Sequence, residues 1–237
     1  MKTLIISLGG SIIIPAPDKV DVKFLKKFRQ LILDYTKRGN RAAIITGGGK
    51  INKLYNGFAQ KIAKIKPIDL DWLGISFTRA NAELVRSIFG DYAYEKIITD
   101  PTKKIPARGW SASGGKTNKK IIIGCGWKPG CSSDKDAVLI AKNLGAKTIV
   151  NLTNIDYVYT ADPRKVKDAK PIKKMTWDEY KKLIGGKWIP RMNSPFDPIA
   201  AKLAAKLKLE VAIMKGTNLD NFKKFLGGKK FKGTIIK

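Results

Sequence analysis

The 237-residue sequence contains no histidine and only two cysteines, Cys125 and Cys131. Without an imidazole, any mechanism that needs a histidine base, a Ser–His pair or a histidine metal ligand is excluded. Two thiols alone cannot complete the four-ligand set of a usual structural zinc site. We therefore expect two reduced thiols and no metal site built by the protein itself.

Acidic residues are also scarce, because 19 Asp and Glu face 47 Lys and Arg, a formal net charge of +28. Such an excess attracts phosphates of any kind, from nucleotides to RNA. The lysines are spread along the whole chain, whereas a nucleic-acid-binding face more often shows a clustered basic stripe with interleaved aromatic residues. The pattern favours a general basic bias over specific nucleic-acid binding.

Long hydrophobic runs are missing as well. No apolar stretch approaches the roughly 18–20 residues of a membrane helix. The first segment, Met1 to Leu8, lacks the length and the cleavage site of a signal peptide. We expect a cytoplasmic protein without a membrane partner. Hydrophobic residues make up 43% of the chain, which is enough for a sizeable core.

Apolar runs alternate with helical patterns along the chain, as in repeated β-α units over a mostly parallel sheet. An α/β fold is therefore expected. The expected strands are 3–8, 42–46, 97–98, 121–123, 148–152 and 211–214. The expected helices are 22–35, 50–63, 71–89, 135–144, 177–184, 198–207 and 219–226. Residues 101–120, rich in Lys, Ser and Gly, read as an exposed loop.

Glycine-rich turns follow two of these strands. Gly9-Gly10-Ser11 follows the first strand and by itself is equally typical of a plain tight turn. Gly47-Gly48-Gly49 lies between a strand and a helix, where three glycines add no packing and cost chain entropy. Such a junction makes sense if its N–H groups and the helix N-terminus hold a phosphate. Lys50 and Lys53 then add positive charge in the first helical turn.

Two further polar segments follow expected strands. Cys131-Ser132-Ser133-Asp134 precedes helix 135–144. It is either an N-cap with an acidic first turn or a set of hydroxyls facing a ligand, with Asp134 orienting a cation. Residues 151–163 form a long polar and aromatic loop after a strand, the place where open α/β sheets bind ligands.

Taken together, these segments resemble the amino-acid kinase family, and within it the archaeal type of uridylate kinase. The matching stretches come in family order and span nearly the whole chain. They are Leu8–Ser11 (LGGS), Gly47–Lys50 (GGGK), Asp71–Ala82 (DWLGISFTRANA), Ser132–Asp134 (SSD), Thr153–Pro163 (TNIDYVYTADP), Asp197–Lys202 (DPIAAK) and Gly233-Thr234.

The resemblance implies a three-layer αβα sandwich formed by one domain, residues 1–237. Residues 1–147 would form the lobe for UMP binding and oligomerisation, and residues 148–237 the ATP-binding lobe. Family members of this type are usually hexamers, so a homo-oligomer is expected. Helix 22–35 is either an interface or core.

The implied activity is transfer of the γ-phosphoryl group of ATP to UMP, giving UDP and ADP in pyrimidine nucleotide biosynthesis. Mg²⁺ would be carried by the nucleotide. The phosphate of UMP is already anionic, so positioning and charge neutralisation suffice and histidine is dispensable. The alternatives are another small-molecule kinase of this fold, such as an isopentenyl phosphate or acetylglutamate kinase, and a non-catalytic nucleotide sensor or basic nucleic-acid binder.

The resemblance also implies a role for individual residues. Those for UMP are Gly47, Gly48, Gly49 and Lys53 at the phosphate, Asp71 at the ribose, and Ser132 and Ser133 at the uridine and the transferred phosphoryl group. Those for ATP are Gly9, Gly10 and Ser11 at the phosphates, and Thr153, Asn154, Tyr159 and Asp162 at the nucleoside. The catalytic set is Gly10, Ser11, Asp134 and Arg191.

Three positions need comment. Arg191 ends Gly186–Arg191, which resembles the acetylglutamate kinase segment that ends in a catalytic lysine; the alternative is a surface arginine paired with Asp197. Ser7 stands where many family members carry a lysine. Tyr157 replaces a usual glycine.

Overall fold

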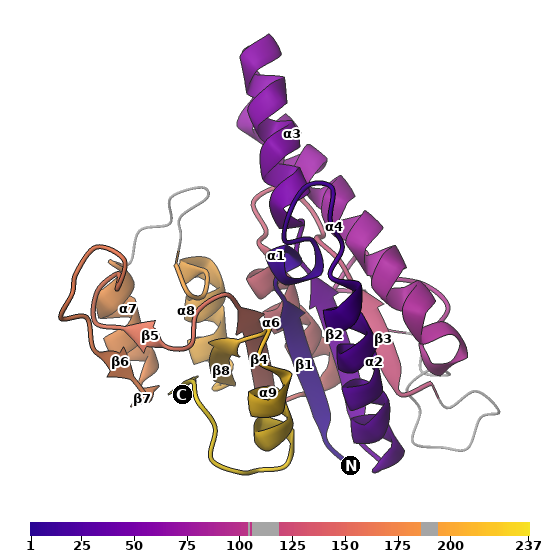
Figure 1. The fold of residues 1–237 in the computed structure, drawn as a ribbon, viewed down its shortest axis with the longest axis vertical. Coiled ribbons are helices and arrows are strands. Elements are labelled where there is room, and N and C mark those ends of the chain that lie inside the picture. Colours follow the sequence, from indigo (N-terminus) through magenta and orange to yellow (C-terminus); the bar gives the residue numbers. More distant parts are fainter. Residues whose placement is uncertain (104, 106–118, 186–193) are drawn as a thin grey trace.

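The computed structural model describes residues 1–103, 105, 119–185 and 194–237. At its centre lies a seven-stranded sheet with the strand order β3-β2-β1-β4-β8-β9-β7 (Figure 1). Every neighbouring pair is parallel except β8 and β9. The strands are β1 (Thr3–Leu8), β2 (Arg41–Thr46), β3 (Ile121–Gly124), β4 (Thr148–Thr153), β7 (Lys174–Met175), β8 (Glu210–Lys215) and β9 (Thr234–Ile236).

The central strands form because their sequences are continuous apolar runs, the pattern of parallel strands buried on both faces. All six residues of β2 are buried, as are five of the six in β1. In the register of the sheet, Leu8 pairs with Thr46 on one side and with Leu152 on the other. The turns after β1, β2 and β4 therefore leave the sheet at the same edge.

Helices cover both faces of the sheet, which confirms the predicted three-layer αβα sandwich. One layer contains α2 (Val22–Lys37), the second half of α4 (Pro67–Phe89) and α9 (Leu219–Leu226), whose apolar side chains pack in one core cluster. The other layer contains α6 (Ser133–Leu144), α7 (Trp177–Ile184) and α8 (Pro198–Lys206), around a second cluster. Apart from the exposed Val22, the apolar residues of α2 are buried, Phe28 and Ile32 fully, so this face of the helix belongs to the core.

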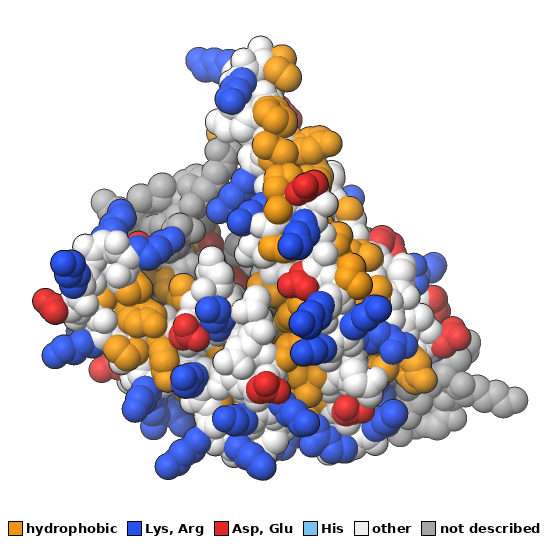
Figure 2. Space-filling view, viewed as in Figure 1, with side chains coloured by type: hydrophobic (Ala, Val, Ile, Leu, Met, Phe, Trp, Pro, Cys, Tyr) orange, Lys and Arg blue, Asp and Glu red, His pale blue; other side chains and the backbone are white. Residues whose placement is uncertain are grey.

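The helix α3 (Gly49–Ile62) differs from the others because it contains no buried residue. Together with the start of α4 it projects beyond the ends of the strands (Figure 1). Tyr55, Phe58 and Ile62 of α3 are exposed, and so are Ile68 and Trp72 of α4. Figure 2 shows hydrophobic side chains down one side of this projection, with basic side chains at its tip and scattered over the rest of the visible face.

Most predicted elements form within a few residues of the expected bounds. The helix expected at 71–89 starts earlier, at Pro67, because proline is well suited to the first helical position. The strand expected at 97–98 is wrong, since Ile98 makes only an isolated parallel bridge to Gly124. Several short elements were not predicted. They are the single-turn helices α1 (Gly10–Ile13) and η1 (Gly90–Tyr92), the hairpin of β5 (Val158–Tyr159) and β6 (Pro171–Ile172), and the strands β7 and β9 of the main sheet.

Both cysteines are free, with Cys125 buried and Cys131 half-buried. Within the described ranges, none of the helices has the length and hydropathy needed to cross a membrane.

Candidate active site

The two glycine turns lie in direct contact. A Cβ atom added to Gly10 would be 2.1 Å from the backbone nitrogen of Gly49 and 2.5 Å from the carbonyl oxygen of Gly47. Gly49 also has a φ of +78°, in the left-handed region that favours glycine. Side chains are therefore excluded at this contact, and the backbones after β1 and β2 form one continuous surface.

A cavity of about 660 Å³ opens over this surface. It brings together residues that the sequence analysis assigned to different ligands. Ser11 comes from the predicted ATP-phosphate turn, Gly48, Gly49 and Lys53 from the predicted UMP-phosphate turn, and Asn154 from the predicted nucleoside loop. The α3 helix begins at Gly49 beside the cavity, and the first N–H groups of a helix have no partner within it. The site thus offers backbone donors and lysine charge to anions.

Side chains of α4 hold the elements around this surface. Asn81 donates from Nδ2 to the carbonyl oxygen of Gly47 at 2.7 Å. The Thr78 carbonyl accepts from Thr46 Oγ1 at 2.9 Å, and Thr78 Oγ1 accepts from the Gly126 amide at 2.8 Å. The motif Asp71–Ala82 contains both residues, but the sequence did not indicate these roles of Thr78 and Asn81, because their partners are distant in sequence.

Asp71, the predicted ribose ligand, also lies on α4. Its Oδ2 atom accepts a hydrogen bond from the Gly130 amide at 3.1 Å, and the residue is exposed. This contact joins α4 to the loop that follows β3 and leads to Ser132 and Ser133. Asp71 and the two serines are thus parts of one loop-and-helix junction on the β3 side of the glycine turns.

The segment before α6 confirms the N-cap interpretation, whereas the ligand-facing role of its hydroxyls stays a prediction. Ser132 is the N-cap of α6, with Oγ accepting from the Lys135 amide at 3.2 Å. Asp134 instead points toward the sheet, where Oδ1 accepts from Ser7 Oγ and Oδ2 from the Asp197 amide, both at 3.1 Å. Burial raises the pKa of Asp134 to about 6. Ser7 therefore takes part in a network with Asp134.

The predicted nucleoside residues line a second cavity, of about 370 Å³. Thr153, Asn154, Tyr159 and Asp162 all contribute to it, together with Pro195. Arg164 donates to both Asp162 oxygens, at 3.0 and 2.9 Å, and holds the pKa of that carboxyl below its usual range. The ring of Tyr157, where the family usually has glycine, lies edge-on to that of Tyr159, with centroids 6.3 Å apart.

Thr234 fixes the loop that forms this second cavity. Its hydroxyl oxygen accepts from the Val158 amide at 2.8 Å, and the hydroxyl donates to the Ile172 carbonyl. The Gly233-Thr234 motif thus holds the β5–β6 hairpin against β9 of the main sheet. Sequence reasoning recognised the motif without predicting this contact.

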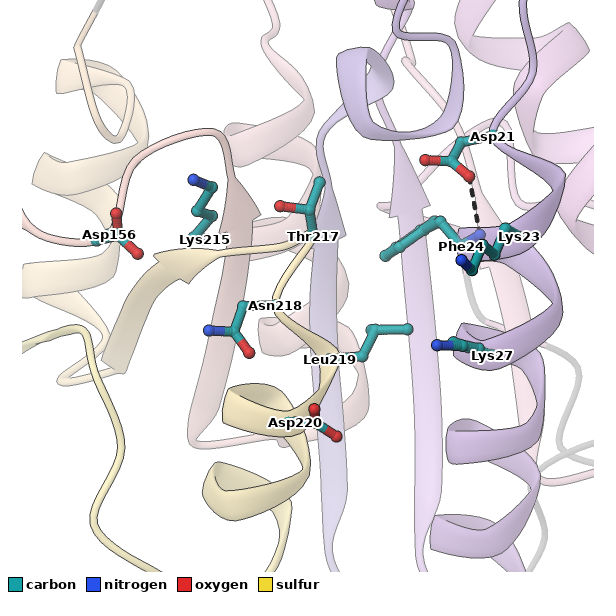
Figure 3. A pocket seen from close by; sticks show the side chains of 10 residues that line it. All are labelled: Asp21, Lys23, Phe24, Lys27, Asp156, Lys215, Thr217, Asn218, Leu219 and Asp220. Atoms are coloured by element: carbon teal, nitrogen blue, oxygen red, sulfur yellow. Dashed lines mark hydrogen bonds between the residues drawn. The ribbon is translucent and has the colours of Figure 1, made fainter.

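Another cavity, of about 530 Å³, lies between the N-terminal ends of α2 and α9 (Figure 3). Three lysines and three aspartates line it, so their charges balance. Both helix ends are already capped, by Asp21 on the Phe24 amide and by Asn218 on the Asn221 amide. This cavity therefore lacks the excess of positive charge that Lys50 and Lys53 give the cavity at the glycine turns.

Arg191, predicted to be catalytic, lies outside the described residues, and its role stays a prediction. Within the described part of the chain, no cluster of three or more Cys, Asp or Glu side chains could hold a metal ion.

Comparisons with known proteins show which family the chain belongs to. The model of the amino acid kinase family matches residues 2–215. A uridylate kinase from Methanospirillum hungatei is 30% identical, with 100% of this chain and 95% of that protein covered. One from Pyrococcus abyssi is 33% identical, with 89% of each covered.

Solved structures give the same result. The crystal structure of uridylate kinase from Archaeoglobus fulgidus superposes with a TM-score of 0.81 at 26% identity, covering 100% of both chains. A UMP kinase from Bacillus anthracis, 19% identical and with a TM-score of 0.77, covers 99% of this chain and 95% of its own and shares the fold. The chain belongs to the amino acid kinase family.

Proposed function

We propose that this protein is a UMP kinase that transfers the γ-phosphoryl group of ATP to UMP, giving UDP and ADP. The observation that carries the proposal is the contact of Gly10 with Gly47 and Gly49, which brings the two glycine turns together beside one cavity. Direct phosphoryl transfer requires two phosphate-bearing molecules aligned end to end, and this geometry offers that alignment. The uridylate kinases among its relatives support UMP as the acceptor.

In this proposal the two halves of the sheet bind different substrates. Strands β3, β2 and β1 come from residues 1–147, and β4, β8, β9 and β7 from residues 148–237. The first half holds UMP through Gly47, Gly48, Gly49 and Lys53 at the phosphate, with Asp71, Ser132 and Ser133 at the nucleoside side. The second half holds the ATP nucleoside through Thr153, Asn154, Tyr159 and Asp162, and Gly9, Gly10 and Ser11 hold its phosphates.

For phosphoryl transfer, the protein mainly has to bind the two nucleotides and orient them. An oxygen of the UMP phosphate forms a bond to the γ-phosphorus while the bond from that phosphorus to the bridging oxygen breaks, and ADP leaves. The attacking oxygen is already anionic, so no side chain needs to remove a proton. Backbone N–H groups and lysines stabilise the charge on the transferred group, where one donor is typically worth about 10²–10³ in kcat.

Mg²⁺ bound to ATP would supply further positive charge at the phosphates. Asp134 fits the part of a carboxylate that organises such a cation. Each of its oxygens accepts one hydrogen bond and keeps a lone pair, and its raised pKa reflects burial without a nearby cation among the described residues. The cation would then lie near the N-terminus of α6, where Asp134 accepts a hydrogen bond from the Asp197 amide of the second half.

A panel of acceptors tests the proposal. With MgATP, we expect UMP to give a kcat/KM at least tenfold above CMP, AMP, isopentenyl phosphate and N-acetylglutamate. A higher value for one of the last two would assign the protein to another kinase of the same family. Absence of turnover with every acceptor, together with salt-sensitive RNA binding, would favour a non-catalytic role.

We also propose that the protein acts in the cytoplasm as a homo-oligomer, a hexamer as the family resemblance implies. The exposed apolar side chains of α3 and the start of α4 support self-association. Because α3 has no buried residue, packing within one subunit stabilises it little, and packing against a second subunit would bury its apolar side chains.

A further inference from the structure

Asp136 is a buried carboxyl group that the proposed reaction does not use. It lies in the first turn of α6 and is 0% exposed. Its Oδ2 atom accepts a hydrogen bond from the Trp127 amide at 3.2 Å. Its Oδ1 atom is buried and has no hydrogen-bond partner among the residues that the structure describes.

Burying this group is costly. A carboxyl group in apolar surroundings loses its hydration, and burial raises the pKa of Asp136 to about 7. The next two residues of α6, Ala137 and Val138, are fully buried without such a cost. An apolar residue at position 136 would serve packing better, so the distinctive contribution of Asp136 is an acceptor oxygen for the loop amide.

The loop that donates this hydrogen bond connects β3 to α6, and three side-chain acceptors hold its amides. Thr78 Oγ1 accepts from the Gly126 amide, Asp136 from the Trp127 amide, and Asp71 from the Gly130 amide. Two of these acceptors come from α4 and one from α6. Asp136 is therefore the one of the three that joins the loop to the helix carrying Ser133 and Asp134.

The same framework fixes the loop relative to the phosphate-binding turn. Through Asn81, α4 also binds the carbonyl oxygen of Gly47. At the other end, the loop runs into Ser132, the N-cap of α6. A shift of the loop would move Ser132 and Gly130 relative to the Gly47 turn, and small displacements of binding groups have large effects on positioned substrates.

We infer that Asp136 is a positioning residue for the acceptor site: its side chain holds the Trp127 amide and thereby fixes the β3–α6 loop against α6. The inference rests on the proposed function, in which this loop faces the nucleoside of UMP. Asp136 itself does not touch the substrate.

Three variants separate positioning from general stability. Asp136→Ala removes the acceptor, Asp136→Asn keeps an oxygen for the Trp127 amide, and Val138→Ala truncates a neighbouring buried side chain of the same helix. We expect Asp136→Ala to raise KM for UMP about tenfold, while KM for ATP changes less than about twofold. Asp136→Asn should stay within about threefold of the wild type, and Val138→Ala should leave KM for UMP unchanged.

Hydrogen–deuterium exchange of peptides spanning residues 124–132, measured without nucleotides, provides a second readout. Asp136→Ala should exchange faster there, and Asp136→Asn should not. Equal exchange in both variants and the wild type, or an equal rise in KM for UMP in Val138→Ala, would overturn the inference.

The experiments distinguish failure of the proposed function from failure of the inference about Asp136. If the wild type phosphorylates another acceptor and not UMP, the function is wrong, and the same KM comparison is then made with that acceptor. If Asp136→Ala does not fold, Thr78→Val, which removes the neighbouring acceptor for the Gly126 amide, should give the same split between the two KM values. An unchanged KM for the acceptor in Thr78→Val would then contradict loop positioning.

Discussion

At Gly10 the fold leaves no room for a single methyl group. The nearest atoms to an added Cβ are backbone atoms of Gly47 and Gly49, which cannot rotate away as a flexible side chain would. Glycine is required here because two chain segments meet backbone to backbone, and the same contact creates the cavity proposed to hold both phosphates.

Gly10→Ala should therefore push the two turns apart. We expect kcat/KM for UMP to fall at least about 100-fold, because displacements near 1 Å have effects of that size. Gly57→Ala is the matched control. Gly57 lies within α3 with open space around it, so alanine should stabilise the helix by about 0.5–1 kcal/mol and leave activity unchanged. Equal activity of Gly10→Ala and the wild type would show that the contact has no catalytic importance.

Asp136 should also make stability depend on pH. Its pKa in the folded protein is about 7, above the ordinary value of 3.8 expected after unfolding. The folded state thus binds the proton more tightly. This contribution is fully present below about pH 4 and is lost as the pH rises through about 7.

Urea unfolding of the wild type and Asp136→Asn between about pH 5 and pH 8 measures this effect. The wild type should lose stability relative to Asp136→Asn as the pH rises, by up to about 3 kcal/mol over this range. Parallel stability curves for the two proteins would show that the carboxyl group is not desolvated in solution.

At the scale of elements, α4 is the helix that fixes the loops of the proposed acceptor side. Its buried second half packs in the core, and its polar side chains bind the Gly47 turn and the β3–α6 loop. Asn81→Ala would leave the Gly47 carbonyl without this donor, at a cost of about 1–3 kcal/mol. We expect KM for UMP to rise about tenfold, with a smaller change in KM for ATP.

Ser76→Ala is the control for this prediction. Ser76 lies on the same helix, but its hydroxyl donates only to the Trp72 carbonyl one turn earlier. The variant should bind UMP like the wild type. If both variants raise KM for UMP equally, the effect belongs to the helix as a whole and not to the Asn81 contact.

The sequence predicts the elements whose patterns are strong and local. The apolar runs of β1 and β2 and the amphipathic pattern of α2 allow the layers of the fold to be predicted. The one-turn helix α1 and the two-residue strands β5 and β6 are too short to leave a periodic pattern. The segment 97–98 looks like a strand because it is apolar, yet only Ile98 pairs.

The candidate site is predictable to the extent that its residues follow strand ends. Parallel strands bring the Gly9 and Gly47 turns to one edge, so their proximity follows from the alternating pattern. The contacts of Asn81 with Gly47, and of Thr234 with Val158, join residues 34 and 76 positions apart. No local pattern encodes such partners, so these positioning roles required the structure.

At the scale of the whole molecule, the projecting α3–α4 pair exposes apolar side chains, whereas the protein as a whole is rich in charged residues. Ile62 is 85% exposed, which is unusual for a side chain of this size. If this projection is an interface between copies of the chain, light scattering after size-exclusion chromatography should give a multiple of the 26.2 kDa subunit mass.

Phe58→Asp in α3 should then reduce the mass, whereas Val166→Asp should leave it unchanged. Val166 is exposed on the loop between β5 and β6 and serves as the control. A monomeric wild type, or an unchanged mass for Phe58→Asp, would rule out this interface.

The central claim is that two glycine turns hold two phosphate-bearing substrates end to end in one cavity. A crystal structure with UMP and a non-hydrolysable ATP analogue tests it most directly. The UMP phosphate should lie on the Gly47–Gly49 turn at the amides of Gly48 and Gly49, since the Gly47 amide already donates to the Leu8 carbonyl, and the γ-phosphate should face it from the Gly9–Ser11 side. A UMP phosphate bound away from the Gly47 turn, or two nucleotides in unconnected pockets, would contradict the account.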